Sequence, residues 1–298
     1  MNLLNQMPSL IAFVRVVESG SFSAAARAAG MTPSAVSKGI GRLEAELGSK
    51  LFQRSTRSLH LTLEGRAFFD RVAPLLRGIE DSANAFRPEG GAHGLLRVSM
   101  PSEIGRLLMK PIAAFLASHG GLELDLSLSD RYVEVIGGGY DVVFRVGFPI
   151  DSELKSRTLA SMDMALVATP GLLARHGQPA TANQLASLPF VRYLMHGRAL
   201  PITFKDGTSI QPRGQIGVDT GAALRAAALE GMGVTHIMRC TVQDDLDRGS
   251  LVVVADDTRL PSLPLHSLHA FGAHTPARVR LFTDFISREV QGLQRKAG

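Results

Sequence analysis

The chain lacks the features that mark secreted and membrane-bound proteins. Its single cysteine, Cys240, excludes an internal disulfide and fits a reducing compartment, and we interpret it as a small buried hydrophobic residue rather than a redox sensor. No apolar run approaches the roughly 18 residues that cross a bilayer, and residues 10–17 are interrupted by Arg15 and lack a basic leader. We therefore expect a cytoplasmic protein that does not bind membranes.

Signature motifs of enzymes are also missing. The sequence has no nucleophile elbow, Walker phosphate loop or complete dinucleotide fingerprint, because Gly231 and Gly233 form only a fragment that follows a helix. His266, His269 and His274 come nearest to a metal-ligand spacing, but strand residues three apart point to opposite faces. These absences predict a protein that is not an enzyme and needs no metal or cofactor.

Basic residues, in contrast, are concentrated near the N-terminus. The 298 residues, 45% of them hydrophobic, are enough for about two domains, and the net charge is +5. Residues 21–60 hold most of this excess, because only Glu44 and Glu46 oppose the basic set Arg27, Lys38, Arg42, Lys50, Arg54 and Arg57. This location indicates contact with a polyanion.

The same segment shows a helix pair with a tight turn. Residues 10–17 have apolar side chains at helical spacing and end at Gly20, after which Ser21 or Ser23 can cap a short second helix. Gly30 breaks that helix. A third helix follows at once, which is the helix-turn-helix arrangement, and the last helix of such a pair enters the major groove of DNA.

The third helix has a capped start and two distinct faces. Thr32 can cap it, with Pro33 at the first helical position. Its buried stripe is Val36, Ile40, Leu43 and Leu47, and its outward face carries Thr32, Ser34, Ser37, Lys38 and Arg42. An amphipathic helix with a solvated polar face is the alternative, but the glycine turn, the capped restart and the basic charge favour DNA reading.

A two-stranded wing is predicted next. Leu51 and Phe52 have a buried pattern, and residues 59–61 form a short return strand. Arg54 and Arg57, near the tip, are placed to meet phosphates or the adjacent minor groove, although isolated surface arginines are usually only solvated.

The stretch SFSAAARAAGMTPSAVSKGIGRLEAELGSKLFQRSTRSLHLTLEGRAFF resembles the DNA-binding domain of LysR-type transcriptional regulators. The resemblance covers residues 7–86 densely and the remainder loosely. We expect DNA contacts from Ser23, Thr32, Pro33, Ser34, Ser37, Lys38, Arg42, Arg54 and Arg57. Gly39 and Gly41 depart from the pattern, since each costs a helix interior about 0.5–1 kcal/mol relative to alanine and leaves its position bare.

A long helix then links the two halves. After Thr62, which can cap the helix, apolar residues recur with a heptad pattern: Phe68, Val72, Leu75, Ile79 and Phe86. So long a seam needs another helix, and the resemblance implies the linker helix of a partner subunit, with assembly to a tetramer through the sensor lobes. The alternative is a lone helix packed on its own sensor domain. Pro74 removes one helical hydrogen bond and can bend the helix.

The second half alternates strand and helix patterns. Strands are expected at residues 95–100, 122–128, 133–136, 141–146, 164–169, 216–218, 234–237 and 265–271, and helices at 104–116, 222–229 and 276–294. This alternation predicts parallel sheets with covering helices. The resulting architecture is a winged helix-turn-helix domain (1–61), a linker helix (62–87), and an α/β two-lobed domain of the periplasmic-binding-protein type (88–298). Lobe I is expected at 94–161 and 267–298, and lobe II at 162–266.

Three strand ends should meet between the lobes. Ser102 and Thr220 begin helices after strands, and Arg145 ends a strand, so an anion there would gain charge-assisted hydrogen bonds. For Arg145 a structural salt bridge to an aspartate is an equal alternative, and Ser102 and Thr220 can be plain helix caps. Arg131 and His196 complete the expected effector-binding set, with a surface loop as the alternative for His196.

Two functions fit these features. The first is a ligand-responsive regulator that binds double-stranded DNA, a small anionic organic effector and further copies of itself. The second is a solute-binding or enzymatic α/β protein whose first ninety residues serve as a dimerisation arm. The capped cationic helix followed by a basic hairpin favours the first.

We predict that DNA binding depends on residues 32–57 and is steeply salt-dependent, because phosphate contacts release counterions. Arg54→Ala or Arg57→Ala should weaken specific and non-specific binding about equally and flatten the salt slope. Replacing Ser34, Ser37 or Lys38 should instead shift the preference between sequences by about 1–3 kcal/mol at one base pair. Titrations at several salt concentrations measure both effects, and unchanged slopes for both arginine variants would remove the wing from the contact surface.

Overall fold

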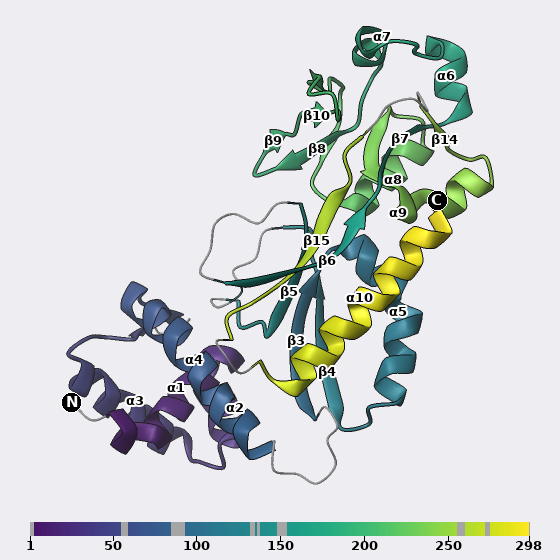
Figure 1. Cartoon of the computed structure of the whole chain (residues 1–298). Helices are drawn as coiled ribbons and strands as arrows, with labels where there is room; N and C mark the ends of the chain where they lie inside the picture. Colours follow the sequence, from purple (N-terminus) through teal and green to yellow (C-terminus); the bar gives the residue numbers. More distant parts are fainter. Residues whose placement is uncertain are drawn as a thin grey trace. The chain divides into compact units, whose positions relative to one another are not determined.

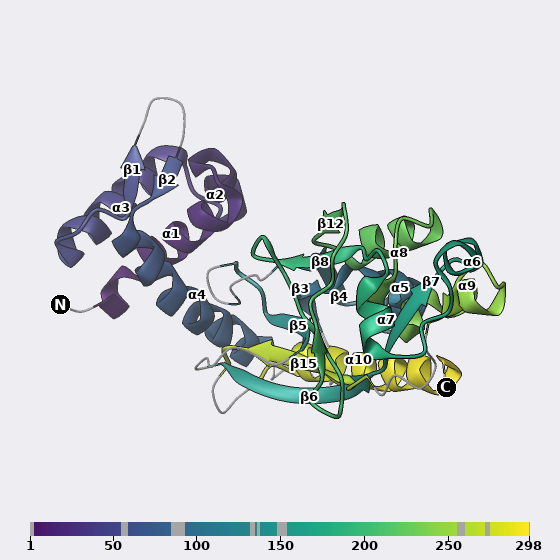
Figure 2. The ribbon, with the colours of Figure 1, turned by 90° about the horizontal axis from the view of Figure 1, so that it is seen from above.

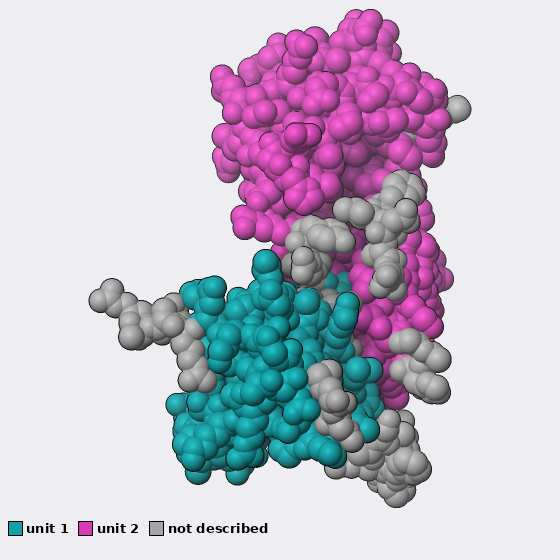
Figure 3. Space-filling view, turned by 90° about the vertical axis from the view of Figure 1, so that its left-hand side faces the viewer, with its two compact units in different colours: residues 1–90, 134–140 teal, residues 91–133, 141–298 magenta. Residues whose placement is uncertain are grey.

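The computed structural model describes residues 3–54, 59–84, 93–131, 135, 138–147, 154–254, 260–271 and 275–297. The chain divides into two compact units, coloured separately in Figure 3. The first unit comprises Met1–Gly90 with Glu134–Tyr140, and the second comprises Gly91–Val133 with Asp141–Gly298.

The N-terminal unit is a winged helix-turn-helix, as predicted. Its elements are η1 (Leu3–Gln6), α1 (Met7–Ser19), α2 (Phe22–Ala28), α3 (Pro33–Leu47), β1 (Phe52–Arg54), β2 (Leu59–Leu61) and α4 (Leu63–Asn84). Ser21, not Ser23, caps α2, and Thr32 caps α3 by accepting a hydrogen bond from the amide of Ala35. Gly30 adopts a positive φ of 63° in the turn between these helices. The wing strands β1 and β2 are antiparallel (Figure 2).

Phe13 of α1 lies at the centre of this unit's core. Its ring centroid is 5.5 Å from those of Phe52 and Phe68 and 6.3 Å from that of Phe69. Aromatic side chains of this size dominate the apolar area that a small core buries. The Phe13 side chain therefore packs against both the first wing strand and the N-terminal half of α4.

The two glycines inside α3 differ in their surroundings. A Cβ atom on Gly39 would lie 3.2 Å from Oγ of Ser9, so this glycine permits the close approach of α3 to α1. A Cβ atom on Gly41 would meet nothing within 4 Å. The helix interaction explains Gly39, whereas nothing in the packing explains Gly41.

Helix α4 distributes its apolar residues differently from the predicted single seam. Phe69, Ala73 and Leu76 are buried in the core of the unit, and Phe68 and Val72 pack partly against it. Leu75 and Ile79, in contrast, are 68% and 54% exposed. The predicted seam is therefore split, because its first half is covered within the chain. Phe86 lies outside the described residues.

Lobe I of the second unit is built on a five-stranded sheet, which α10 follows along its length (Figure 1). Its elements are β3 (Gly94–Met100), α5 (Ser102–Ala117), β4 (Leu122–Leu128), β5 (Val142–Val146), β6 (Lys155–Met162), β15 (Leu263–His269) and α10 (Ala277–Ala297). The strand order is β4-β3-β5-β15-β6. The first three strands are parallel, as predicted, but β15 runs antiparallel to both β5 and β6.

Lobe II departs further from the predicted parallel sheet. Its elements are β7 (Met164–Ala168), α6 (Pro170–His176), α7 (Ala182–Ser187), β8 (Arg192–Met195), β9 (Arg198–Ala199), β10 (Ile202–Thr203), β11 (Ser209–Ile210), β12 (Gly217–Val218), α8 (Gly221–Leu229), β13 (Thr235–Met238), α9 (Arg239–Asp247) and β14 (Val252–Val253). Its sheet β13-β7-β14 is antiparallel throughout, and the parallel expectation is wrong there. Only β12 and β8 pair in parallel within lobe II's named strands.

Two chain segments cross between the lobes. β6 passes through Asp163 directly into β7, and the return segment enters β15 through Ser262. The Ser262 hydroxyl donates to Oδ1 of Asp163 over 2.7 Å, so the two crossings are joined where they meet. Of the strand predicted at 133–136, the structure describes only Val135, which is a buried turn residue.

Candidate functional site

The outward face of α3 carries the residues expected to meet DNA. On α3 and its N-cap, Thr32, Pro33, Ser34, Lys38 and Arg42 are exposed, and Ser37 is half-buried. Ser23, the remaining expected contact before the wing, is exposed on α2. The opposite face buries Val36, Ile40 and Leu43 completely. Arg54 is the last residue of β1, and its side chain is not among the described parts of the structure. Arg57 lies outside the described residues.

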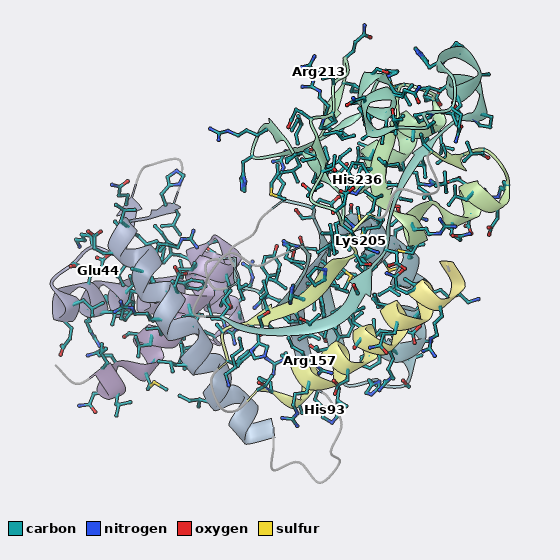
Figure 4. The ribbon with its side chains drawn as sticks, turned by 45° about the horizontal axis from the view of Figure 1, so that its top comes forward. Glu44, His93, Arg157, Lys205, Arg213 and His236 are labelled. Carbon is teal, nitrogen blue, oxygen red and sulfur yellow. The ribbon has the colours of Figure 1, made fainter. Side chains whose placement is uncertain are left out.

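Glu44, on the buried side of α3, ties this helix to the wing (labelled in Figure 4). Its carboxylate accepts hydrogen bonds from the backbone amides of Leu51 (3.0 Å) and Phe52 (3.3 Å) and from Nζ of Lys50 (2.7 Å). Burial alone would raise the pKa of Glu44, but these hydrogen bonds together hold the pKa below its ordinary value. Sequence reasoning counted Glu44 only as a negative charge opposing the basic set.

A second polar cluster forms where lobe I meets lobe II, and its centre is Asp130. Oδ1 of Asp130 accepts from the amide of Ser102 (2.8 Å), and Oδ2 accepts from the Ser102 hydroxyl (2.8 Å) and the amide of Gly221 (2.7 Å). Ser102 begins α5 in lobe I and Gly221 begins α8 in lobe II. One carboxylate therefore joins the N-termini of two helices from different lobes.

The start of α5 needs this remote partner. Its N-cap residue is Pro101, which makes no side-chain capping bond, so the first amides of the helix have no local acceptor. Helix α8 has a local cap, since the Thr220 hydroxyl accepts from the amide of Ala223. In this structure Thr220 therefore acts as a helix cap, and Ser102 is hydrogen-bonded to Asp130.

Arg145 and Arg131 hold the segment that contains Asp130. The Arg145 guanidinium donates to the carbonyl oxygens of Ser129 (3.3 Å) and Arg131 (3.0 Å), on either side of Asp130, and to the hydroxyl of Ser99 (3.2 Å). Arg131 pairs with Asp219 of lobe II over 3.3 Å. An aspartate ion pair is therefore described for Arg131, and the hydrogen bonds described for Arg145 go to backbone carbonyls and the Ser99 hydroxyl.

Tyr193 of β8 is a member of this cluster that sequence reasoning missed. Burial, together with the nearby charges of Asp130 and Asp219, raises the pKa of the Tyr193 phenol to about 12. The phenol is therefore neutral at physiological pH and can donate a hydrogen bond. In the sequence Tyr193 stands among the mostly apolar residues 190–195, so no polar motif marked it.

His196 lies apart from these contacts. It occupies the exposed turn between β8 and β9 with a positive φ of 51°, followed by Gly197 at 76°. Two consecutive positive φ values are typical of a tight hairpin turn. The geometry thus accounts for His196 as a turn residue, and its contact with an effector stays a prediction.

Three further features bear on other possible functions: the lone cysteine, metal ligands and membrane-spanning helices. Cys240 is buried, and burial raises the pKa of its thiol to about 11, which disfavours the reactive thiolate. Within the described ranges, no three His, Cys, Asp or Glu side chains are grouped to hold a metal ion. No helix in this same part of the chain is long and apolar enough to cross a membrane.

Comparison with known families assigns both units. Residues 7–66 match the family model of the bacterial regulatory helix-turn-helix protein, lysR family, and residues 89–291 match the LysR substrate binding domain. The chain belongs to the LysR family. The predicted fold class and the family resemblance are thereby confirmed.

Individual relatives resemble the chain over most of its length. An uncharacterized HTH-type regulator of Escherichia coli K12, YhjC, is 30% identical over 95% of this chain and 97% of its own. The solved structure of CrgA, a LysR-type transcriptional regulator from Neisseria meningitidis, is 31% identical, covers 95% of this chain and 98% of CrgA, and has a TM-score of 0.61. Full-length AphB, a virulence activator of Vibrio cholerae, is 28% identical over 96% and 98% of the two chains, with a TM-score of 0.57.

The protein is therefore a DNA-binding transcriptional regulator of the LysR type with a substrate-binding domain, and not an enzyme. LysR-type regulators bind DNA and small-molecule effectors and form oligomers. The alternative of a solute-binding protein or enzyme with a helical arm is set aside, because the N-terminal match is to a regulatory helix-turn-helix.

Glu44→Gln should destabilise the DNA-binding unit of this LysR-type regulator by about 1–3 kcal/mol at neutral pH, because a charged acceptor of buried amides is lost. Since the folded-state pKa of Glu44 is lowered, its stabilisation is present above the ordinary carboxyl pKa of about 4.3 and is lost as pH falls through the folded value. When urea unfolding is measured from pH 7 to pH 3, the free energy of unfolding should fall less with acid in the variant than in wild type. Glu46→Gln, exposed on the same helix, is the control. Equal behaviour of the two variants would contradict the wing-anchoring role.

Proposed function

We propose that this regulator responds to a small anionic organic molecule bound where the two lobes meet. The supporting observation is Asp130, because the protein itself places a carboxylate against the amides of Ser102 and Gly221. The first amides of a helix, with the positive end of its dipole, favour negative charge. The donors that hold Asp130 are therefore suited to an effector carboxylate.

Neighbouring groups give the proposed site its selectivity. Arg145 and Arg131 supply guanidinium groups, Ser102 and Thr220 supply hydroxyls, and the neutral phenol of Tyr193 is a further donor. Charge-assisted hydrogen bonds are roughly twice as strong as neutral ones, so a neutral solute of the same shape gains less here. His196 is retained only as a predicted peripheral contact.

A thermal-shift screen of organic acids and their matched amides on the full chain tests the effector. Acids should raise the melting temperature as their concentration exceeds Kd, whereas the amides should not. Arg145→Ala and Thr220→Ala should weaken binding of a hit; losing a charge-assisted bond of about 1.5–3 kcal/mol corresponds to about 10–100-fold in Kd.

Arg157→Ala is the matched control for that screen. Arg157 is also an arginine on the lobe I sheet, but it pairs with Asp284 of α10 (Figure 4). An acid that binds equally well to Arg145→Ala and Thr220→Ala would place the site elsewhere. Hits confined to neutral or cationic compounds would refute an anionic effector.

On the DNA side, the proposed contacts are the full predicted set: Ser23 of α2, the residues Thr32, Pro33, Ser34, Ser37, Lys38 and Arg42 at α3, and the wing arginines Arg54 and Arg57. The matched ranges 7–66 and 89–291 support domain limits near 1–61, 62–87 and 88–298. Since its DNA target is reached only inside the cell, the protein is proposed to act in the cytoplasm.

The proposed dimer forms through α4, with a tetramer through the sensor lobes. Leu75 and Ile79 support the dimer, because two large apolar side chains four residues apart on one helix are exposed in the single chain. Such neighbours on a helix surface are suited to cover the same stripe of a second helix.

The pair Leu75→Glu with Ile79→Glu should dissociate the dimer, because two charges would enter an apolar interface. Sedimentation should show a smaller species, and DNA affinity should fall because two half-sites are no longer bound together. Leu63→Glu, at an 87% exposed leucine on another face of α4, should change neither. An unaltered oligomer in the double variant would exclude this interface.

A further inference from the structure

The contacts of Asp130 carry an inference about how the proposed effector site is regulated. Three donors converge on this carboxylate: the amide and hydroxyl of Ser102 and the amide of Gly221, all within 2.7–2.8 Å. Two of the three belong to lobe I and one to lobe II. These are the donors that an effector anion would need.

We propose that Asp130 is a tethered competitor of the effector and thereby determines which ligands this regulator accepts. The inference rests on the proposed effector site between the lobes. A ligand reaches the amides of Ser102 and Gly221 only by replacing the Asp130 carboxylate. Only a ligand with its own anionic oxygens restores the charge-assisted bonds that are broken in the exchange.

The surrounding residues hold Asp130 in this position. Arg145 binds the carbonyl oxygens of Ser129 and Arg131, so the backbone is fixed on both sides of Asp130. A Cβ atom on Gly221 would lie 3.2 Å from Cγ of Glu103 and 3.8 Å from Oδ2 of Asp130, so a glycine permits this close approach. A group held in place by its own chain competes at a high effective concentration.

Replacing Asp130 also changes what joins the lobes. The bond from the Gly221 amide to Asp130 links lobe II to lobe I, and the adjacent pair Arg131–Asp219 makes a second link. An anion that takes the place of Asp130 breaks the first link and substitutes its own contacts. Ligand binding is thereby coupled to the contact between the lobes, as a ligand-driven shift between two arrangements requires.

Sulfate is a suitable probe, because it offers anionic oxygens and requires no knowledge of the natural effector. The full chain is titrated with sodium sulfate, with sodium chloride at equal ionic strength as the salt reference, while thermal unfolding is followed. Asp130→Ala and the isosteric Asp130→Asn are compared with wild type. Asp125→Ala, which removes an exposed carboxylate from β4 of the same lobe, is the matched control.

If Asp130 occupies the donors nine-tenths of the time, its removal should lower the apparent Kd for sulfate by about tenfold, because affinity scales with the competent fraction. Asp125→Ala should behave as wild type. Hydrogen exchange at the Ser102 and Gly221 amides should also become faster in Asp130→Ala without sulfate and slow again when sulfate is added.

Equal sulfate responses in the Asp130 and Asp125 variants, with unaltered exchange at both amides, would overturn the proposal. Asp130→Asn is the control for misfolding, because it keeps the side-chain volume and one acceptor oxygen but removes the charge. A third outcome is that organic acids bind wild type through Arg145, while sulfate affinity is unaltered in both Asp130 variants. This outcome would reject Asp130 as a competitor but leave the proposed effector site standing. A sulfate gain without any organic-acid hit would support the competitor while rejecting the proposed effector class.

Discussion

The start of α5, which has no local side-chain cap, is the constraint on which the effector unit depends. A helix leaves its first amides without internal partners, and the usual remedy is a local Ser, Thr, Asp or Asn side chain. Helices α6, α7 and α8 have this remedy in Thr169, Thr181 and Thr220. Helix α5 does not, because its N-cap is Pro101. Asp130 supplies the acceptor instead, and by also binding Gly221 it joins the two lobes.

The DNA-binding unit follows the same physical rule with a different residue. The amides of Leu51 and Phe52, at the start of the wing, point at the carboxylate of Glu44 on the recognition helix. Burying a carboxylate is costly unless it is hydrogen-bonded, and here Lys50 completes the set. In both units, one acidic side chain satisfies amides of a distant element and thereby sets the relative position of two functional surfaces.

Several parts of the fold could be predicted because their signals are local. The cap at Thr32, the turn at Gly30 and the apolar stripe of α3 each depend on residues within one or two helical turns. The cap and the turn are found, and the stripe buries Val36, Ile40 and Leu43, with Leu47 partly buried. The parallel pairing of β3, β4 and β5 follows from alternation of strands with a crossover helix. The strand β6 was missed because its first four residues, 155–158, are all exposed and polar, so they show no apolar alternation.

The sequence by itself determined the family, the order of the helix-turn-helix, wing, linker and sensor units, and the surface of α3 that faces outward, because periodicity and capping act over short distances. Only the tertiary structure decided that Arg145 binds carbonyls around Asp130, that Arg131 pairs with Asp219, and that Gly39 lies against Ser9. It also divided the apolar residues of α4 between the core and the exposed side. The physical reason is that these partners are distant in sequence, as Asp130 and Gly221 are by 91 residues, and their meeting depends on how whole elements pack.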